Sequence, residues 1–386
     1  MQVKNSLPIL GIILLLSACG KKADPAKNDE QKLVIGDGSA CKLPHANPSY
    51  DLGLGFPRDG YRQKTTGTVN VAVIFVDFSD AQAVRTPQNI FGYMSPGAEN
   101  FLSSVSFEKQ TVVFRPLFKW FRMSKPSTAY GWNALTFNLH QAYIQEAVNL
   151  ADPEYDFSQI DQIVIMSNPD GGALFNGPAF IGVLGNGIVA DGRVILNAVT
   201  SGQDLKVFTS LWFPHEFGHC MGLPDLYRYA APQQVFVGDF SLMANISGTA
   251  PTQNAWEKWF LGWFSDSQVI SVTGQRSGSA KLTPVELPDG PKLLVFPLDA
   301  TSAVIVEDRR ALTEDRNLMK AGPLVYLMDT RISNGYGPMK VLPIETDDQT
   351  RRDAPLSVGA SVTYGGVTLT CTASSADGST ISYERK

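Results

Sequence analysis

His215 and His219 lie four residues apart, and Glu216 follows the first histidine directly. On a helix with about 3.6 residues per turn, residues four apart leave the same face, so both imidazoles can bind one ion. The carboxylate of Glu216 is then placed to take a proton from a water on that ion. This His-Glu-x-x-His spacing predicts a zinc site on a helix, with His215 and His219 as ligands and Glu216 as the general base.

The residues after His219 supply a third ligand. A tetrahedral catalytic zinc needs three protein ligands and an open position for water. A helix that continued six residues past His219 would carry its next side chain about 9 Å away along the axis, so the chain must turn back. Gly222 can end the helix in the left-handed conformation, and Pro224 prevents the helix from resuming. We therefore predict Asp225 as the third ligand of the zinc.

Pro214 constrains the start of this helix. An interior proline loses a hydrogen bond and collides with the preceding turn, so Pro214 must lie near the first turn. We therefore expect the helix to begin late, with a cap near Thr209 or Ser210.

With Gly222 and Asp225, the full motif is His-Glu-x-x-His-x-x-Gly-x-x-Asp. Two later segments of the chain accompany it. They are Gly-Asp-Phe-Ser-Leu-Met at residues 238–243 and the Trp-rich segment at residues 255–263. With a weaker match at residues 73–78, the sequence resembles the immune inhibitor A family of bacterial secreted metallopeptidases, a metzincin-like branch of the zincins. The resemblance covers about residues 65–270 and implies an α+β, zincin/metzincin-like catalytic domain.

The resemblance implies a zinc endopeptidase that acts on protein or peptide substrates. It places Met243 in a methionine turn, where the Met side chain forms an apolar floor below the metal. From spacing alone, Met243 is equally well explained as an ordinary core residue. The family also includes calcium binding, for which Asp77 or Asp80 are candidates, although no loop here has the spacing of a calcium site.

The amino-terminal residues read as a targeting segment rather than as part of the fold. Residues 1–18 have a positive start, a short apolar run and small residues before Cys19, which resembles a bacterial lipoprotein signal peptide. We expect lipidation of Cys19 and anchoring to the cell envelope, at the outer membrane of a Gram-negative source. The alternative is an ordinary signal peptide with an incidental cysteine. Residues 19–62, rich in polar residues, Gly and Pro, are predicted to form a flexible tether.

Composition and length set the remaining domains. About 320 residues remain after the leader and tether, enough for two domains. We assign residues 63–264 to the peptidase domain and residues 265–386, with short strands between turns, to a β-sandwich-like module. The net charge of −5 is mild and no basic patch is present, so we expect no nucleic-acid partner. Pairing of Cys41 with Cys371 stays open.

Strands are predicted at residues 69–78, 162–167 and 194–199, with a helix at residues 138–151. In such a sheet, a peptide substrate binds as an added strand along the edge. Residues 183–190 and residues 193–199 are both candidates for that edge. His140, on the predicted helix, is interpreted as a packing residue rather than a ligand.

Three functions remain open at this stage. The first is hydrolysis of peptide bonds by a zinc-bound water that Glu216 activates. The second is a catalytically inactive, peptidase-like binding lipoprotein on the cell surface, against which the presence of Glu216 argues. The third is a zinc hydrolase with a non-peptide substrate.

Overall fold

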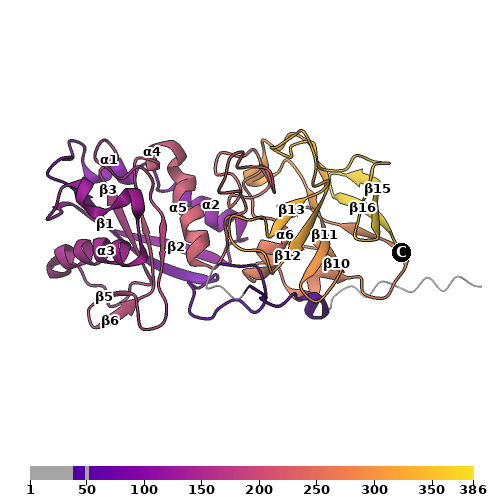
Figure 1. Ribbon diagram of the computed structural model, residues 1–386, viewed down its shortest axis with the longest axis horizontal. Helices are drawn as coiled ribbons and strands as arrows, with labels where there is room; N and C mark the ends of the chain where they lie inside the picture. The colour runs from indigo at the N-terminus through magenta and orange to yellow at the C-terminus, as the bar shows by residue number, and fades with distance from the viewer. Residues whose placement is uncertain (1–37, 48–51) are drawn as a thin grey trace, which may run out of the picture. The chain divides into compact units, whose positions relative to one another are not determined.

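The computed structural model describes residues 38–47 and 52–386 (Figure 1), which belong to one compact unit. The predicted signal peptide and Cys19 lie outside the described residues. The fold mixes α and β structure, with several sheets and few helices.

A five-stranded sheet in the order β2-β1-β3-β7-β4 carries the first half of the chain. Its first four strands are parallel, and β4 lies antiparallel to β7 at the edge. The central strand β1 is an almost unbroken apolar run, as expected of a strand that is covered on both faces. The strands are β1 (Gly67–Asp77), β2 (Gln110–Arg122), β3 (Gln162–Ser167), β4 (Ala179–Ile181) and β7 (Asn197–Thr200).

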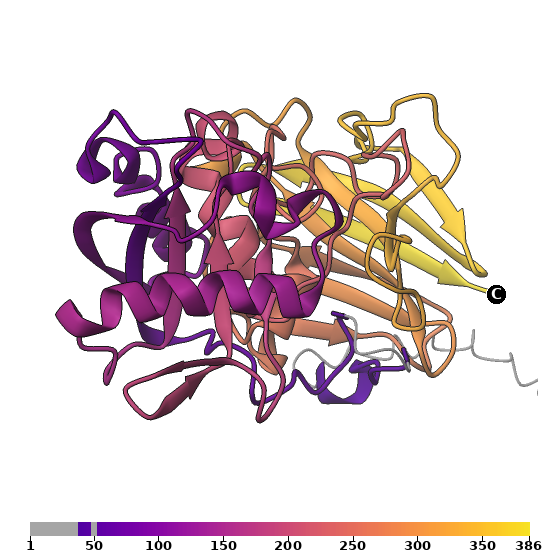
Figure 2. The ribbon, with the colours of Figure 1, turned by 60° about the vertical axis from the view of Figure 1, so that its left-hand side comes forward.

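Helices cover both faces of this sheet. Helix α3 (Phe137–Ala151) lies on one face, in front of the strands in Figure 2, and buries Tyr143, Ile144 and Val148 against them. Its bounds agree with the predicted helix at residues 138–151. The other face is covered by α2 (Gly97–Val105) and α5 (Trp212–Cys220). The remaining helices are α1 (Pro87–Phe91), α4 (Leu205–Phe208) and α6 (Ala255–Phe260), and β5 (Ile188–Ala190) and β6 (Arg193–Ile195) form a separate hairpin.

Two further sheets make up the last part of the chain. One has the order β13-β12-β11-β10-β8 and the other the order β14-β15-β16-β9, and both contribute to one buried apolar cluster. These sheets are built of short strands, as predicted for residues 265–386. The strands are β8 (Val269–Ser271), β9 (Ser277–Leu282), β10 (Leu293–Pro297), β11 (Ser302–Arg309), β12 (Gly322–Asp329), β13 (Met339–Val341), β14 (Ser361–Tyr364), β15 (Val367–Ser375) and β16 (Gly378–Arg385).

The largest apolar core runs across residue 264, where we placed the domain boundary. It joins residues of β1 and α5 to Leu293 of β10 and Leu324 of β12. A buried ion cluster crosses the same position, because Arg309 pairs with Asp315 at 2.7 Å and donates to the carbonyl of Thr252 at 3.1 Å. The division into two domains therefore stays a prediction about the chain's organisation, within one continuous core.

The predicted tether differs from the structure wherever it is described. Cys41, Leu43 and Leu54 are buried, and Trp256 donates its indole N–H to the carbonyl of Leu54 at 2.9 Å. Phe56 packs on Trp259 of α6 with ring centroids 4.7 Å apart. Residues 38–47 and 52–62 are thus part of the fold. The Gly-, Pro- and polar-rich composition around these apolar side chains was therefore misleading.

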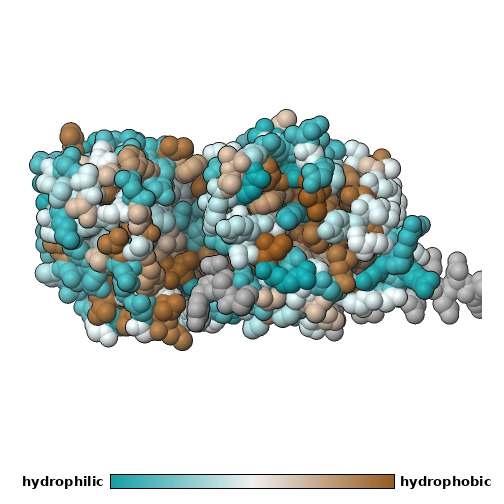
Figure 3. Space-filling model, viewed as in Figure 1, coloured by the Kyte–Doolittle hydropathy of each residue, from teal (hydrophilic) through white to brown (hydrophobic). Residues whose placement is uncertain are grey.

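The surface is mixed in character. Figure 3 shows hydrophilic and hydrophobic residues interspersed on one face, with brown groups at the lower left near the β5–β6 hairpin, where Val189 and Val194 are exposed. Among the described residues, no helix combines the length and the apolar character needed to cross a membrane. The described cysteines form no disulfide, and the thiol of Cys41 donates to the carbonyl of Gly38.

Candidate metal centre

Helix α5 carries the two histidines. It begins at Trp212, after a 3-10 turn at Thr209–Leu211, and no side chain caps it. The expected cap at Thr209 or Ser210 was therefore wrong, because the 3-10 turn leads directly into the helix. Pro214 is the third residue of the helix, within the first turn as predicted, where its missing N–H has no partner to lose.

Both imidazoles are buried and oriented by main-chain carbonyls. His215 Nδ1 lies 3.0 Å from the carbonyl oxygen of Leu242, and His219 Nδ1 lies 2.8 Å from that of Leu223. Since a carbonyl only accepts, each Nδ1 carries a proton, and the neutral rings then present the lone pair of Nε2. These two carbonyls are the orienting acceptors that a metal-binding histidine needs, and the sequence could not identify them.

The chain reverses directly after α5. Gly222 has φ +104°, a conformation that residues with a Cβ rarely adopt. The Gly222 N–H donates to the main-chain carbonyl of His219, and the Leu223 N–H donates to the carbonyl of Gly218, both at 2.9 Å. These two hydrogen bonds close the end of the helix. This turn brings Asp225 Oδ1 to 3.4 Å from His215 Nε2 and 3.2 Å from His219 Nε2. The structure thus brings together the three residues predicted as ligands.

The distances from Asp225 Oδ1 to the two imidazole nitrogens are those expected around a tetrahedral zinc. Ligand bonds of about 2.0–2.1 Å at tetrahedral angles place neighbouring ligand atoms about 3.3 Å apart. The ligand atoms of the group lie within 4.8 Å of one another, and Asp225 Oδ1 is buried without a hydrogen-bond partner among the described residues. Three acceptor atoms converging in a buried place repel one another unless a metal ion or a proton lies between them. The residues present therefore fit a bound divalent cation.

Asp225 and His219 shift each other's pKa values. Burial lowers the pKa of His219, but the adjacent charge of Asp225 reverses the effect and raises it to about 9. Burial likewise opposes ionisation of Asp225, yet the two imidazoles outweigh it and hold the pKa of that carboxyl well below its ordinary value. Asp225 is consequently anionic at neutral pH, and a metal that binds here displaces the proton of His219.

Asp225 is itself held by groups that sequence reasoning missed. Tyr229 donates its hydroxyl to Asp225 Oδ2 at 3.0 Å. The Asn334 side chain accepts the main-chain N–H of Asp225, and Gly335 N–H donates to the Asp225 carbonyl at 3.3 Å. Asn334 and Gly335 lie between β12 and β13, more than a hundred residues away, where Asn-Gly reads only as a turn. No signal in the sequence connects this turn to the third ligand.

Glu216 borders a cavity of about 320 Å³ that also contacts His215 and Tyr227. Its Oε2 accepts the main-chain N–H of Ala179, at the start of β4, at 2.7 Å. Burial raises the pKa of Glu216 above its ordinary value, although the two histidines oppose the shift. The carboxylate predicted to act as the base thus faces a cavity large enough for a ligand, beside both histidines.

Met243 lies directly beneath the motif helix. A Cβ placed on Gly218 would come within 2.6 Å of Met243 Sδ, so the thioether fills the space that the glycine leaves open. Met243 is fully buried, and its carbonyl accepts the N–H of Leu226, next to Asp225. An apolar side chain therefore lies against α5, and its role as the floor of a methionine turn stays a prediction.

The edge of the sheet is not where the sequence suggested. Neither residues 183–190 nor residues 193–199 form it, since β7 is an interior strand and β5 and β6 make their own hairpin. The edge strand beside Glu216 is β4, only three residues long, with Glu216 bonded to its first residue, and the opposite edge is β2. A strand this short shows no alternation in the sequence, which explains why it was missed.

Other residues weighed from the sequence lie apart from this group. The carboxylate of Asp77 binds Arg122 and that of Asp80 binds Ser127, and neither belongs to a group of three or more possible metal ligands of the His, Cys, Asp or Glu type among the described residues. His140 Nε2 lies 2.9 Å from Thr200 Oγ1 inside the α3 side of the core, in agreement with a packing role.

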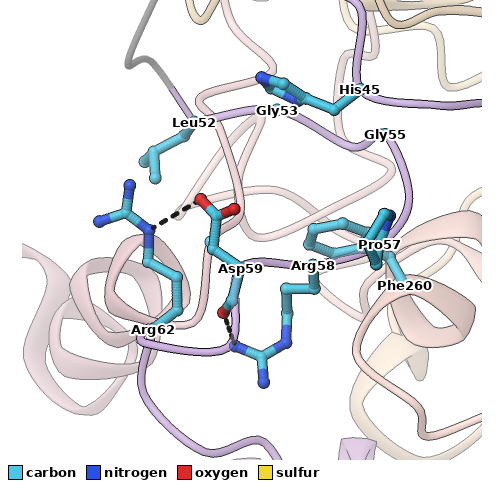
Figure 4. A pocket seen from close by; sticks show the side chains of 10 residues that line it. His45, Leu52, Gly53, Gly55, Pro57, Arg58, Asp59, Arg62 and Phe260 are labelled. Carbon is cyan, nitrogen blue, oxygen red and sulfur yellow. Dashed lines mark hydrogen bonds and ion pairs between the residues drawn. The ribbon is translucent and has the colours of Figure 1, made fainter.

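Behind the turn at Gly222 lies a cavity of about 20 Å³, the size of one water (Figure 4). Figure 4 shows Arg58 pointing downward while Arg62 points toward Leu52, with Asp59 between them. Arg58 donates to the carbonyls of Gln63 at 3.1 Å and Met221 at 3.4 Å. It thereby ties the amino-terminal segment to the end of α5.

Known proteins offer little similarity to this chain. No protein-family model matches the chain, and no curated protein matches it. Among solved structures, the catalytically inactive OgpA from Akkermansia muciniphila, in complex with an O-glycopeptide (glycodrosocin) substrate, is similar with a TM-score of 0.30 and 11% sequence identity. The match covers 73% of this chain and 89% of that chain. A TM-score of 0.30 is too low to assign this chain to the fold of that protein.

Proposed function

We propose that this protein is a zinc-dependent endopeptidase with a zincin-like catalytic domain. The observation that carries the proposal is the convergence of His215 Nε2, His219 Nε2 and Asp225 Oδ1, with Glu216 beside them on an open cavity. A structural zinc site is closed by four protein ligands, whereas this group offers three, and one of them, His215, lines a cavity. The arrangement therefore favours catalysis over a purely structural metal.

Zinc bound by these residues would supply Lewis acidity, lowering the pKa of a water and polarising the scissile carbonyl. Glu216 accepts the proton of that water on Oε1, the oxygen that Ala179 does not engage, and later delivers it to the leaving amine. The carbonyls of Leu242 and Leu223 keep each imidazole in the tautomer that presents Nε2. Tyr229 and Asn334 hold Asp225 in place.

The substrate would bind along β4. Thr200 N–H donates to the Pro178 carbonyl, and Gly182 N–H donates to the Leu196 carbonyl, so alternate residues of this segment face β7. By the two-residue period of a strand, the main-chain groups of Ala179 and Ile181 face the other way. Because the Ala179 N–H is already donated to Glu216, the Ala179 carbonyl and the main-chain groups of Ile181 are the ones that can pair with an extended peptide, whose scissile bond then lies beside Glu216.

We place this activity in the cell envelope, on a lipoprotein anchored through Cys19, with proteins or peptides as partners. The support is the sequence of residues 1–19 alone.

The test compares the wild type with Glu216→Gln on an unfolded protein substrate, after zinc loading. We expect each protein to bind one zinc, and we expect at least a hundredfold slower cleavage by the variant, within the usual range for loss of a general base. Zinc binding without any cleavage by the wild type would favour the binding lipoprotein or a hydrolase for other bonds. Equal cleavage by both proteins would remove Glu216 from the mechanism.

A further inference from the structure

A cavity of about 310 Å³ opens along β4, next to the cavity that Glu216 borders. Its walls come from the start of α3, the turn before it and β4 itself. We call it the edge pocket, and its apolar lining residues are Trp132, Leu135, Phe137, Phe180 and Ile181.

The edge pocket is continuous with the proposed site. Asn176 lines both cavities. Ala179 lines the edge pocket with its neighbours and also donates its N–H to Glu216 at 2.7 Å. A peptide that is cut beside Glu216 and paired with β4 must therefore pass over this pocket.

The faces of β4 determine which peptide residue reaches it. Phe180 packs in the core on the α3 side of the sheet, whereas Ala179 packs on the α5 side. Residues directly opposite each other on paired strands project to the same face. The peptide residue opposite Phe180 consequently turns its side chain toward α3 and the edge pocket, and it neighbours the residue opposite Ala179, where the bond is cut.

The chemistry of the pocket is apolar and aromatic. The rings of Phe137 and Phe180 lie 4.8 Å apart, and Phe137 is 37% exposed, so an apolar wall remains open to a ligand. The described lining includes no Asp, Glu, Lys or Arg, and the lining histidine, His140, is engaged with Thr200. A charged side chain in this pocket would lose water without gaining a partner.

Resting on the proposed function, we propose that the edge pocket selects substrates with a bulky apolar or aromatic side chain beside the scissile bond. The residues that set this preference are Phe137 and Leu135, which form the accessible walls. Aromatic rings in such a pocket gain from burial and from ring contacts of favourable geometry.

The test uses a quenched-fluorescence peptide that the protein cuts once, with each position within two residues of the cut changed in turn to Ala, Phe or Asp. At one position we expect Phe to raise kcat/KM about tenfold over Ala, and Asp to lower it. Phe137→Ala and, separately, Leu135→Ala should bring the Phe-to-Ala ratio close to one. Leu139→Ala is the matched control, because Leu139 is an exposed apolar residue of α3 outside the pocket, and it should leave the ratio unchanged.

Zinc content and melting temperature of each variant show that it is folded. Cleavage that depends on Glu216 but has no apolar preference at any position overturns the edge-pocket proposal and leaves the peptidase proposal standing. The same holds if Phe137→Ala changes the ratio no more than Leu139→Ala does. Absence of cleavage by the zinc-loaded wild type overturns both proposals.

Discussion

The contact between Gly218 and Met243 gives a quantitative test of how the floor of the metal site is built. In Gly218→Ala, the new Cβ would lie 2.6 Å from Met243 Sδ and 3.2 Å from Met243 Cε. Both distances are shorter than an ordinary carbon or sulfur contact, and Met243 is fully buried, so the thioether has to shift within a packed core.

Two effects of opposite sign combine in this substitution. Forcing an extra methyl into a packed core costs about 1–3 kcal/mol. Replacing a helical glycine by alanine contributes about 1 kcal/mol of stability. In the background Met243→Ala the obstructing sulfur is gone, so only the helix effect remains. We therefore expect Gly218→Ala to be neutral or destabilising in the wild type and stabilising by about 1 kcal/mol in Met243→Ala, a coupling of about 1–3 kcal/mol.

Urea denaturation of the wild type, the two single variants and the double variant measures this coupling, with a chelator present so that metal binding does not contribute. Met243→Ala alone should cost about 2–5 kcal/mol, because it leaves a cavity. If Gly218→Ala changes the unfolding free energy equally in both backgrounds, Met243 does not lie against the motif helix and the reasoning is refuted.

Two further predictions concern groups outside the motif. Asn334→Ala should weaken zinc binding about 10–100-fold, the usual effect of removing a group that orients a ligand, because Asp225 N–H loses its acceptor. Competition with a chromophoric chelator measures the affinity, and Tyr336→Phe, an exposed neighbour, should leave it unchanged. Burial lowers the pKa of His140 to about 4, so the unfolded chain takes up a proton below pH 6.5 that the folded chain does not. Stability should fall as the pH drops from 6.5 to 4, by up to about 3 kcal/mol from this residue. In His140→Gln that part of the pH dependence should disappear, and an unchanged slope in urea titrations would contradict the assignment.

The parts of the site that were predictable from sequence are those fixed by local geometry. The spacing of His215 and His219 follows from the helical repeat, and the chain reversal follows from the conformational freedom of Gly222. The ligand spacing and the chain reversal both depend only on residues that are close together in the sequence. For the same reason, helix α3 and the apolar strand β1 were recognisable from their periodicity and composition.

The parts that were not predictable depend on contacts between distant segments. Asn334 reaches Asp225 from a turn in the last third of the chain, and the carbonyl of Leu242 orients His215 without any requirement on its own side chain. Every residue has a main-chain carbonyl, so the residue type does not reveal which carbonyl will orient a histidine. The edge strand β4 is defined by its pairing with β7 rather than by a pattern of its own.

The packing of residues 38–47 and 52–62 was missed for a related reason. Leu43 and Leu54 belong to the largest buried apolar cluster, and Phe56 packs on the aromatic side chains of α6, far away in the sequence. The composition of residues 38–47 and 52–62 describes that segment alone, whereas its packing depends on contacts with α6.

The most direct measurement of the central claim is the X-ray absorption spectrum, at the zinc edge, of the zinc-loaded protein. We predict a four-coordinate first shell of nitrogen and oxygen at about 2.0–2.2 Å, with the outer scattering of two imidazoles, and we predict that Asp225→Ala loses this site. A sulfur ligand at about 2.3 Å, or a shell of oxygen atoms alone, would contradict the assignment of His215, His219 and Asp225 as the metal ligands.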